Sequence, residues 1–455
     1  MSNRWQRWHG GVIFVPKINF DSTEKNAPMQ KINIQILFRS GCFAIEVAEV
    51  KDSRYSERAS LSGGFMGFVG IRRKVSVIAA ALWLIAFAAF SAPAQTFQPV
   101  ADGIEHLQMI RGATATDEAT GPFVINLLRV DLGRVAVKVV HALDAAIGVE
   151  TVSSLAARYR AIAAINGGFF VVTGTYRGDA VSALMTDGRL LSEPVNRRAA
   201  VGFVRQNGKT QMVFGHLQFA GAIELAGGRS ITINGLNRQR GNNEVIVYTP
   251  EFHRTTLTLP DGVEILVRQN RVTIVRDHTG SNPIPEDGIV VSASGTRREE
   301  LLKRIKKGMR LKIRTILTPL EAETKQLWQM AQAIVGGSPQ LIHKGRLEIS
   351  RELEGIKEEF VTTRHPRTAI ASLPDGKMLL ATVDGRQPGV SVGMSLTQFA
   401  SLLLEFGAVE AINLDGGGST AMVVNHKLVN KPSDAAGERA VSDAILIFQK
   451  TGKSK

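Results

Sequence analysis

The sequence predicts an α+β fold, rich in strands, with mixed sheets and only a few helices. Most of the chain after residue 95 consists of short runs of β-branched and apolar residues separated by turn signals. An Asp-Gly or Asn-Gly pair between two apolar runs is typical of a tight β-hairpin. Four such pairs occur, at 187–188, 207–208, 261–262 and 375–376.

Helical spacing is clear in only a few segments. The clearest helix is expected to begin at Ser395, with Gln398 three residues later as a capping box, and to end at Gly407. Its apolar residues are Leu396, Phe399, Leu402 and Leu403. A second helix is expected at about 153–160, leading into the apolar run 161–165. The basic stretch 297–312 predicts a short helix with a solvated face, followed by a strand.

A weak internal repeat accompanies the two main helices. Each leads into a buried strand that ends in an asparagine, Asn166 in the first half and Asn413 in the second, followed by a glycine-rich turn. The hairpins at 207–208 and 375–376 occupy similar places. We therefore expect two pseudo-equivalent halves that deliver both asparagines to one cleft; chance similarity is the alternative.

The N-terminal part has the features of an export signal. Three basic residues at 72–74 precede sixteen residues without charge, and Ala92-Pro93-Ala94 ends the segment. We predict a signal peptide over 66–94 that starts at Met66, an upstream extension over 1–65 that is not native, and one catalytic domain over 95–455. A signal anchor is the alternative, but sixteen apolar residues are fewer than the roughly 20 needed to span a bilayer. The protein is expected in the periplasm or secreted, without a stable membrane span after cleavage.

Net charge and cysteine content limit the classes of function that fit the sequence. The full chain carries a net charge of +14, and removing residues 1–94 leaves about +8. This moderate excess does not by itself predict nucleic-acid binding, and an anionic sugar phosphate or polysaccharide fits equally well. The one cysteine, Cys42, lies upstream of the predicted domain, which therefore has no disulfide or thiolate chemistry.

The stretch from Asn413 to Thr420 is the strongest candidate for an active site. Here Asp415 precedes three glycines, Gly416, Gly417 and Gly418, and two hydroxyl residues, Ser419 and Thr420. Consecutive glycines allow backbone N–H groups to form a nest for an oxyanion. A carboxylate beside such a nest is suited to act as nucleophile, base or cation stabiliser, whereas a flexible turn is the structural alternative.

The chain resembles the phosphodiester glycosidase family through five blocks in order along the sequence. These blocks are 166–170, 336–339, 364–369, 383–386 and 413–422. The resemblance implies a hydrolase that cleaves the sugar C1–O bond of a glycosyl-1-phosphodiester, such as N-acetylglucosamine-1-phosphodiester. It leaves the natural sugar and its partner alcohol open.

The resemblance and the chemistry together suggest residue roles. Asp415 is expected to act at the anomeric carbon, with Asp384 as a second carboxylate or as the residue that orients Arg386. Arg367 or Arg386 would hold the phosphate bidentately, since planar guanidinium groups match its oxygens. The other expected substrate-binding residues are Asn166, Gly167, Arg364, His365, Asn413, Gly416, Gly417, Gly418, Ser419 and Thr420. The two asparagines would bind sugar groups or hold the glycine loops in shape.

Several alternatives stay open at this point. Asp384 could belong to a plain turn, His365 could pack or cap, and Arg364 with Arg367 could be solvated rim charges. Arg439 and Asp443 could reach the site or form a structural pair. The segment 336–339 could be an oxyanion contact or a bare loop, and Phe169 and Phe170 could be core residues or a sugar platform.

No cofactor or metal site is predicted, because the histidines are scattered without paired zinc spacing; a divalent cation held by Asp415 is not excluded. Two other functions compete with the glycosidase. One is a non-catalytic envelope polysaccharide-binding protein, and the other is a phosphodiesterase that cleaves the P–O bond.

Overall fold

The computed structural model describes residues 32–39, 42–49, 96–113 and 120–450, and the chain divides into two compact units, Met1–Ala92 and Pro93–Lys455. In the first unit, strands β1 (Ile32–Arg39) and β2 (Cys42–Glu49) form an antiparallel pair. The predicted signal segment 66–94 lies outside the described residues. No helix in the described ranges is both long and apolar enough to cross a membrane.

The second unit is built from several sheets and few helices, which confirms the predicted fold class. Its largest sheet has eight strands in the order β21-β20-β24-β22-β23-β5-β4-β3. Their bounds are β3 Gln98–Ala101, β4 Ile104–Arg111, β5 Phe123–Val130, β20 Gln340–His343, β21 Arg346–Leu347, β22 Arg367–Ser372, β23 Met378–Val383 and β24 Glu410–Asn413. Helix α6 (Leu396–Glu405) packs its apolar side against one face, with α5 (Glu358–Thr362) beside it.

A five-stranded sheet in the order β26-β25-β7-β27-β6 packs on the other face of that sheet. Its strands are β6 Val135–His141, β7 Ala163–Asn166, β25 Met422–Val424, β26 Lys427–Leu428 and β27 Asp443–Gln449. Helix α2 (Val152–Tyr159) covers its outer side. The short turns η1 (Ala142–Asp144) and η3 (Gly417–Ser419) lie at its ends.

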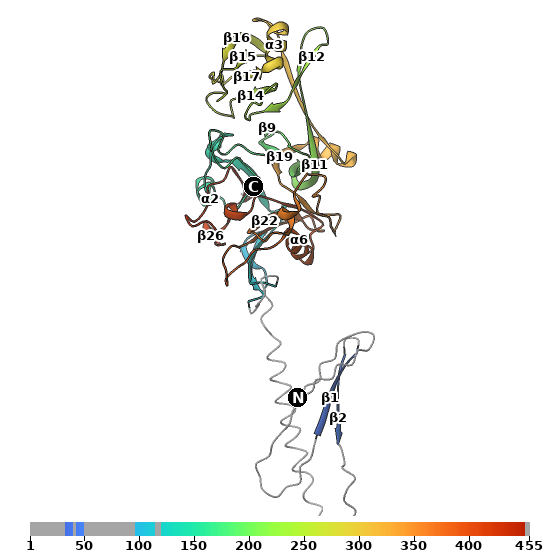
Figure 1. The fold of residues 1–455 in the computed structure, drawn as a ribbon. Helices are drawn as coiled ribbons and strands as arrows, with labels where there is room; N and C mark the ends of the chain where they lie inside the picture. Colours follow the sequence, from blue (N-terminus) through green and yellow to red (C-terminus); the bar gives the residue numbers. More distant parts are fainter. Residues whose placement is uncertain (1–31, 40–41, 50–95, 114–119, 451–455) are drawn as a thin grey trace, which may run out of the picture. The chain divides into compact units, whose positions relative to one another are not determined.

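A seven-stranded sheet connects this body to a separate lobe. Its strands are β8 Leu184–Thr186, β9 Arg189–Ser192, β10 Ala199–Gln206, β11 Lys209–Glu224, β12 Ser230–Ile233, β18 Lys312–Pro319 and β19 Ala331–Gly336. The turn η2 (Ala322–Thr324) and helix α4 (Lys325–Gln329) follow β18. The long strand β11 pairs with β10 in the body and with β12 and β18 further along, so it runs into the lobe (Figure 1).

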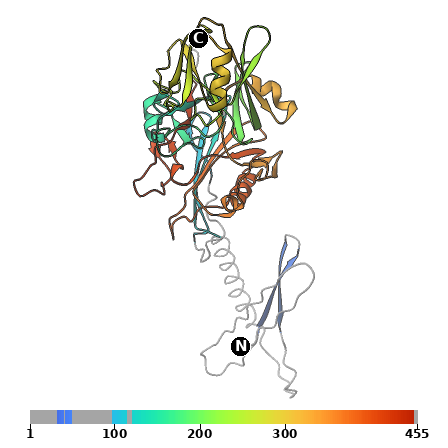
Figure 2. The same cartoon turned by 45° about the horizontal axis from the view of Figure 1, so that its top comes forward.

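The lobe contains a five-stranded sheet and one helix, which gather in both views (Figures 1 and 2). Its elements are β13 Gly235–Leu236, β14 Val245–Tyr248, β15 Gly262–Arg268, β16 Arg271–Thr279, β17 Gly288–Ser294 and α3 Gly295–Arg304. An apolar cluster from this sheet, α3 and the end of β11 fills the lobe. The lobe therefore has a core of its own.

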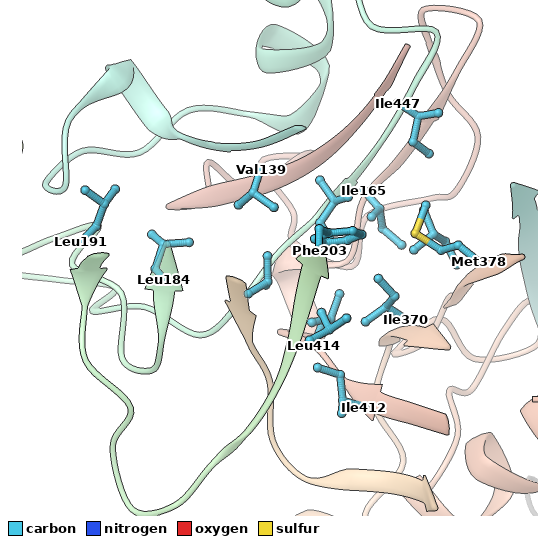
Figure 3. Packing of buried hydrophobic residues seen from close by; sticks show 14 of the residues in the cluster. Val139, Ile165, Leu184, Leu191, Phe203, Ile370, Met378, Ile412, Leu414 and Ile447 are labelled. Carbon is cyan, nitrogen blue, oxygen red and sulfur yellow. The ribbon is translucent and has the colours of Figure 1, made fainter. Parts of the chain in front are cut away.

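The central core of the body is shared by three sheets. Figure 3 shows Ile165 of β7, Ile370 of β22 and Phe203 of β10 pointing into the same cluster. Along β22 the neighbours Ala369 and Ala371 face α6 on the opposite side. The eight-stranded sheet is thus buried on both faces, which explains why its central strands read as continuous apolar runs.

Most of the predicted turns and helices are confirmed. Hairpins form at 187–188, 207–208 and 375–376, and α6 has both capping-box hydrogen bonds. The prediction at 261–262 is wrong, because Gly262 begins β15 and the preceding strand, β14, ends at Tyr248, well before this turn signal. The hairpin in that region turns instead at Gln269 and Asn270, which both have positive φ.

The structure gives no support to the predicted internal repeat. Strand β24 pairs directly with β22 of the 375–376 hairpin. Strand β7 instead pairs with β25 and β27, in a different sheet from the 207–208 hairpin. The two segments share a local pattern of helix, strand and glycine turn, but their strands have different neighbours.

Candidate active site

The glycine loop begins where the buried strand β24 ends. The backbone N–H of Leu414 donates to the Thr368 carbonyl at 2.9 Å, and its side chain is buried. The next N–H, of Asp415, donates to the Gly167 carbonyl at 3.1 Å. The loop is therefore fixed on one side to β22 and on the other to the turn that follows β7.

Three glycine turns meet at this point because their backbones approach closely. A Cβ atom on Gly416 would lie 2.7 Å from the Pro366 carbonyl oxygen, and one on Gly168 would lie 2.6 Å from the Gly336 carbonyl oxygen. Both distances are too short for any side chain. The turns at 167–168, 336–337 and 416–418 thus form one junction, and segment 336–339 is part of it.

Most N–H groups of the loop are used within the protein. Gly416 N–H donates to the Asp415 Oδ1 atom at 3.0 Å, and Gly417 N–H donates to the Pro366 carbonyl at 2.9 Å. Among the described contacts, the Gly418 N–H has no acceptor. The expected open nest of three glycine N–H groups is therefore reduced to this one donor.

Asn166 and Asn413 are buried at the junction and hold it together. Asn166 donates from Nδ2 to the Asp415 carbonyl at 2.7 Å, while its Oδ1 accepts from Thr368 Oγ1 and from Ala421 N–H. Asn413 donates from Nδ2 to the Ser338 carbonyl at 2.7 Å. With exposures of 0% and 1%, neither side chain is open to a sugar, so of the two expected roles the geometry fits the holding of the loops.

Asp415 itself is half-buried, and burial raises its pKa to about 6. Hydrogen bonds from Ser419 and from the Gly416 N–H act in the opposite direction, as does the charge of Arg439. The neighbouring carboxylate of Asp443 adds to the rise. The carboxyl group consequently titrates close to neutral pH.

Two guanidinium groups lie against the glycines of this loop. Arg386 packs on Gly417, where a Cβ atom would lie 3.0 Å from its Nη2 atom, and it contacts His365 Nδ1 at 3.3 Å. Arg439 lies over Gly418 and donates weakly to Ser419 Oγ at 3.4 Å. Arg386 is exposed and Arg439 is partly exposed, so both are accessible to an anionic ligand.

The surroundings of three other predicted residues, Arg367, His365 and Arg364, are also defined. Arg367 is 2% exposed, and its guanidinium donates to the backbone carbonyls of Met394, Phe360 and Thr363. Its Nε and Nη2 atoms are thus unavailable for the expected bidentate phosphate contact. Burial lowers the pKa of His365, as do the nearby arginines, which favours a neutral imidazole. Arg364 keeps a buried Nε atom without a described partner.

Asp384 is also buried, at 3% exposure, and does not pair with Arg386. Its Oδ2 atom accepts from the Lys431 N–H at 3.0 Å, and its Oδ1 atom has no partner among the described residues. Burial raises its pKa to about 6. The predicted role of orienting Arg386 is therefore wrong, and Oδ1 is buried without a hydrogen-bond partner among the described residues.

Asp443 and Arg439 are part of the junction, although no sequence motif assigns them a role. Asp443 Oδ1 accepts from the Gly168 N–H at 2.9 Å and lies where a Gly167 side chain would be. Arg439 is paired with Asp434, with Nε to Oδ2 at 2.8 Å. The position of Asp443 follows from the pairing of β27 with β7, which sequence patterns do not specify.

Phe169 lies at the edge of the junction in an aromatic and cationic stack. Its ring is 6.3 Å from that of Phe360, and the Arg198 guanidinium lies 5.5 Å from its centre. Phe170 is buried in the core below α2. No group of three or more His, Cys, Asp or Glu side chains in the described ranges is arranged to hold a metal ion.

Part of the chain matches a known protein family. The model of the phosphodiester glycosidase family matches residues 261–448, which include Asp384 and Asp415. Mouse N-acetylglucosamine-1-phosphodiester alpha-N-acetylglucosaminidase is 29% identical over 182 residues, which cover 36% of this chain and 34% of the mouse protein. A prophage-derived protein of Bacillus subtilis is 41% identical over 87 residues, 19% of this chain and 13% of that protein. The chain thus matches about a third or less of the length of these two relatives.

Two solved structures share the fold over most of the chain. A hypothetical protein from Synechocystis has a TM-score of 0.67 and 25% identity, covering 79% of this chain and 64% of that one. A candidate exported protein from Burkholderia pseudomallei has a TM-score of 0.64 and 28% identity, covering 72% of this chain and 74% of that one. Together with the family match over residues 261–448, they confirm the resemblance to the phosphodiester glycosidase family that the sequence motifs predict.

Proposed function

We propose that this protein hydrolyses the C1–O bond of a glycosyl-1-phosphodiester, for example an N-acetylglucosamine-1-phosphodiester. The observation that carries the proposal is the half-buried carboxylate of Asp415 in a loop flanked by Arg386 and Arg439. A carboxylate suits the positive charge that develops at an anomeric carbon. Guanidinium groups suit the phosphate that leaves.

Asp415 is assigned to the anomeric carbon. With a pKa of about 6, it is mostly ionised at pH 7 and able to attack C1 or to stabilise the oxocarbenium-like transition state. In the first case its oxygen bonds to C1 while the C1–O bond breaks and the phosphate oxygen takes the electron pair. Water then cleaves the glycosyl ester and regenerates the carboxylate.

The phosphate side is assigned to Arg386, Arg439 and the Gly418 N–H. A phosphomonoester leaves readily as an anion, so this reaction depends less on a strong general acid than ordinary glycoside hydrolysis does. Electrostatic stabilisation of the departing oxygens becomes the larger contribution. Asp384, whose buried Oδ1 atom has no hydrogen-bond partner among the described residues, is the candidate for a second carboxylate.

We further propose that the substrate belongs to envelope or extracellular polysaccharide and that the protein acts in the periplasm or outside the cell. The signal-like segment at 66–94 and the exported candidate among the structural relatives support this location. The mouse relative, by its name, acts on an N-acetylglucosamine-1-phosphodiester, which supports the substrate class.

Sugar release tests the proposal directly. The purified protein and an Asp415→Asn variant would be incubated with UDP-N-acetylglucosamine and a panel of sugar-1-phosphodiesters, and free sugar measured. Release by the parent and not by the variant supports a glycosidase at the glycine loop. Absence of release, with polysaccharide still bound, would favour a non-catalytic binding protein.

The bond that breaks is decided by hydrolysis in heavy-oxygen water. Cleavage at C1–O places the label in the sugar, whereas cleavage at P–O places it in the phosphate. Label in the phosphate would identify a phosphodiesterase and contradict the role assigned to Asp415.

A further inference from the structure

A second candidate site lies between the body and the lobe, apart from the glycine loop. A cavity of about 700 Å³ opens there, within the range of about 300–1,000 Å³ that is typical of small-molecule sites. Its walls come from 171–181, from the loop between β9 and β10, from β11, and from 234–239. None of the glycine-loop residues lines it.

The inner part of this cavity holds a carboxyl group that has no partner. Asp179 is 5% exposed, and its side chain makes no hydrogen bond or ion pair with any described residue. Burial raises its pKa to about 8, and the nearby Glu193 adds to the rise. Glu193, in contrast, accepts from Arg238 Nε at 2.7 Å and from the Leu236 N–H at 3.0 Å.

Such a carboxyl group is costly to the fold. Burial without a hydrogen bond costs free energy, and an apolar side chain of similar size would avoid that cost. Asp179 nevertheless lines the open cavity, where a ligand can reach it. Held protonated near neutral pH, a carboxyl both donates and accepts a hydrogen bond.

The rest of the lining combines apolar walls with polar groups at the rim. Val171, Val181, Leu217 and the half-buried Phe219 form apolar surface. The amides of Gln218, Asn234 and Gln239 are exposed at the rim. A sugar ring presents apolar C–H faces together with hydroxyl groups, which both donate and accept hydrogen bonds. Such a ring matches this combination of apolar walls and polar rim.

The cavity is connected to the active site through two short segments. The carbonyl of Phe169, which follows Gly168 of the junction, accepts a hydrogen bond from the Val181 N–H at 2.8 Å. The Val171 N–H donates to the Asp179 backbone carbonyl at 2.8 Å. The second connection runs through Gly337 of the junction, whose N–H donates to the Ala199 carbonyl at 2.7 Å. Ala199 lies two residues after Arg197, which lines the cavity. Arg198 joins the two segments by donating to the Val181 carbonyl at 2.8 Å.

From this arrangement we propose that the Asp179 cavity is a carbohydrate subsite, which binds an uncharged sugar unit of the polymer whose phosphodiester reaches the glycine loop. This inference rests on the proposed function for its substrate class. A metal ion does not fit, because Glu193 is already paired and no third ligand of the described part joins Asp179.

Binding of sugars without phosphate tests the subsite separately from catalysis. Titration calorimetry would follow the binding of N-acetylglucosamine, glucose and galactose oligomers of two to four units to the full chain. The expected result is binding to the parent and equal binding to Asp415→Asn, since that residue lies outside the cavity. If no oligomer binds the parent, the proposal is overturned.

Three cavity variants locate the binding. Asp179→Leu should weaken it about tenfold or more, because the hydrogen bond is lost, whereas Asp179→Asn should stay within about threefold, because an amide also donates and accepts. Gln218→Ala, on the exposed rim, should weaken binding a few-fold without affecting the fold. Unchanged binding in Asp179→Leu and Gln218→Ala would overturn the proposal.

Two further outcomes separate the alternatives. If Asp179→Asn loses as much binding as Asp179→Leu, the sugar needs an ionised carboxylate as acceptor, and the proposed role of Asp179 as a protonated donor is overturned. If oligomers bind as expected but the protein releases no sugar from any phosphodiester, the subsite stands and the proposed hydrolysis fails.

Discussion

Two aspartates, the half-buried Asp415 in the glycine loop and the buried Asp179 in the cavity, differ in what surrounds their carboxyl groups. Asp415 receives hydrogen bonds from Ser419 and the Gly416 N–H and lies near Arg439. Asp179 receives no hydrogen bond; the nearby carboxylate of Glu193 raises its pKa further, and the charge of Arg238 has a smaller opposite effect. Burial raises the pKa of both, to about 6 for Asp415 and to about 8 for Asp179.

The difference shows how the surroundings of an aspartate set whether its carboxyl group is ionised or protonated near neutral pH. Hydrogen-bond donors and an arginine offset the effect of burial on Asp415, so its carboxyl group is mostly ionised at pH 7. It can then stabilise a developing positive charge. With no hydrogen bond and only the smaller opposing charge of Arg238, Asp179 stays protonated at the same pH and can act as a neutral hydrogen-bonding group. The surroundings, and not the carboxyl group, therefore decide which chemistry each site can perform.

The largest effect is expected from Asp415→Asn. If the carboxylate acts at the anomeric carbon, kcat for sugar release should fall by about 10³-fold or more, since the amide neither attacks C1 nor carries a negative charge. Steady-state release of free sugar measures the change. The matched control is Asp187→Asn, on the exposed β8–β9 turn, which should keep the parent rate. A rate within tenfold of the parent in Asp415→Asn would contradict the assignment.

A second comparison uses two arginines of the same region, one buried and one exposed. Arg367→Met should lower the free energy of unfolding by about 3 kcal/mol, because three carbonyls lose their buried donor. Arg386→Met should leave stability nearly unchanged and raise KM or lower kcat/KM about 10- to 100-fold, because a phosphate contact is lost. Urea unfolding and steady-state kinetics measure the two effects.

The opposite result would exchange the roles assigned to Arg367 and Arg386. Loss of activity in Arg367→Met at unchanged stability would mean that the buried guanidinium reaches substrate after all. In Arg386→Lys, only partial recovery is expected, because an ammonium group cannot make the bidentate contact.

The pH dependence of stability should distinguish Asp179 from ordinary surface carboxylates. Its folded pKa, about 8, lies above the unfolded value of about 3.9, so the folded state binds the extra proton between these values. The free energy of unfolding therefore falls as pH rises through this window, by up to about 1.4 kcal/mol per pH unit. Asp179→Asn removes this loss, so its stability relative to the parent should increase from pH 5 to pH 8 in urea unfolding. A constant difference across that range would show that Asp179 is ionised throughout.

The smallest expected effect concerns Ser419, whose hydrogen bond lowers the pKa of Asp415. In the parent, kcat/KM should rise with pH through about 6 as Asp415 ionises. Ser419→Ala removes the hydrogen bond and should move this rise upward by about one pH unit or less. The pH profile of kcat/KM measures it, and a profile that stays in place would mean that another group controls the acidic limb.

The sequence by itself determined the strand-rich fold, the capped helix α6, three of the four hairpins and the glycine loop with Asp415. These features follow from local chemistry, since capping residues, Asn-Gly or Asp-Gly pairs and glycine runs act on neighbouring backbone. The same local reasoning misread 261–262, where the turn signal begins a strand, and missed the Gln269–Asn270 turn, which has no glycine.

Only the tertiary structure decided which polar groups face a ligand. It buried Arg367 among carbonyls, placed Asn166 and Asn413 inside the junction, and left Arg386 and Arg439 against the glycines. It also formed the Asp179 cavity from segments far apart in the chain. Burial and charge compensation depend on contacts between such distant segments, and a single sequence carries no record of those contacts.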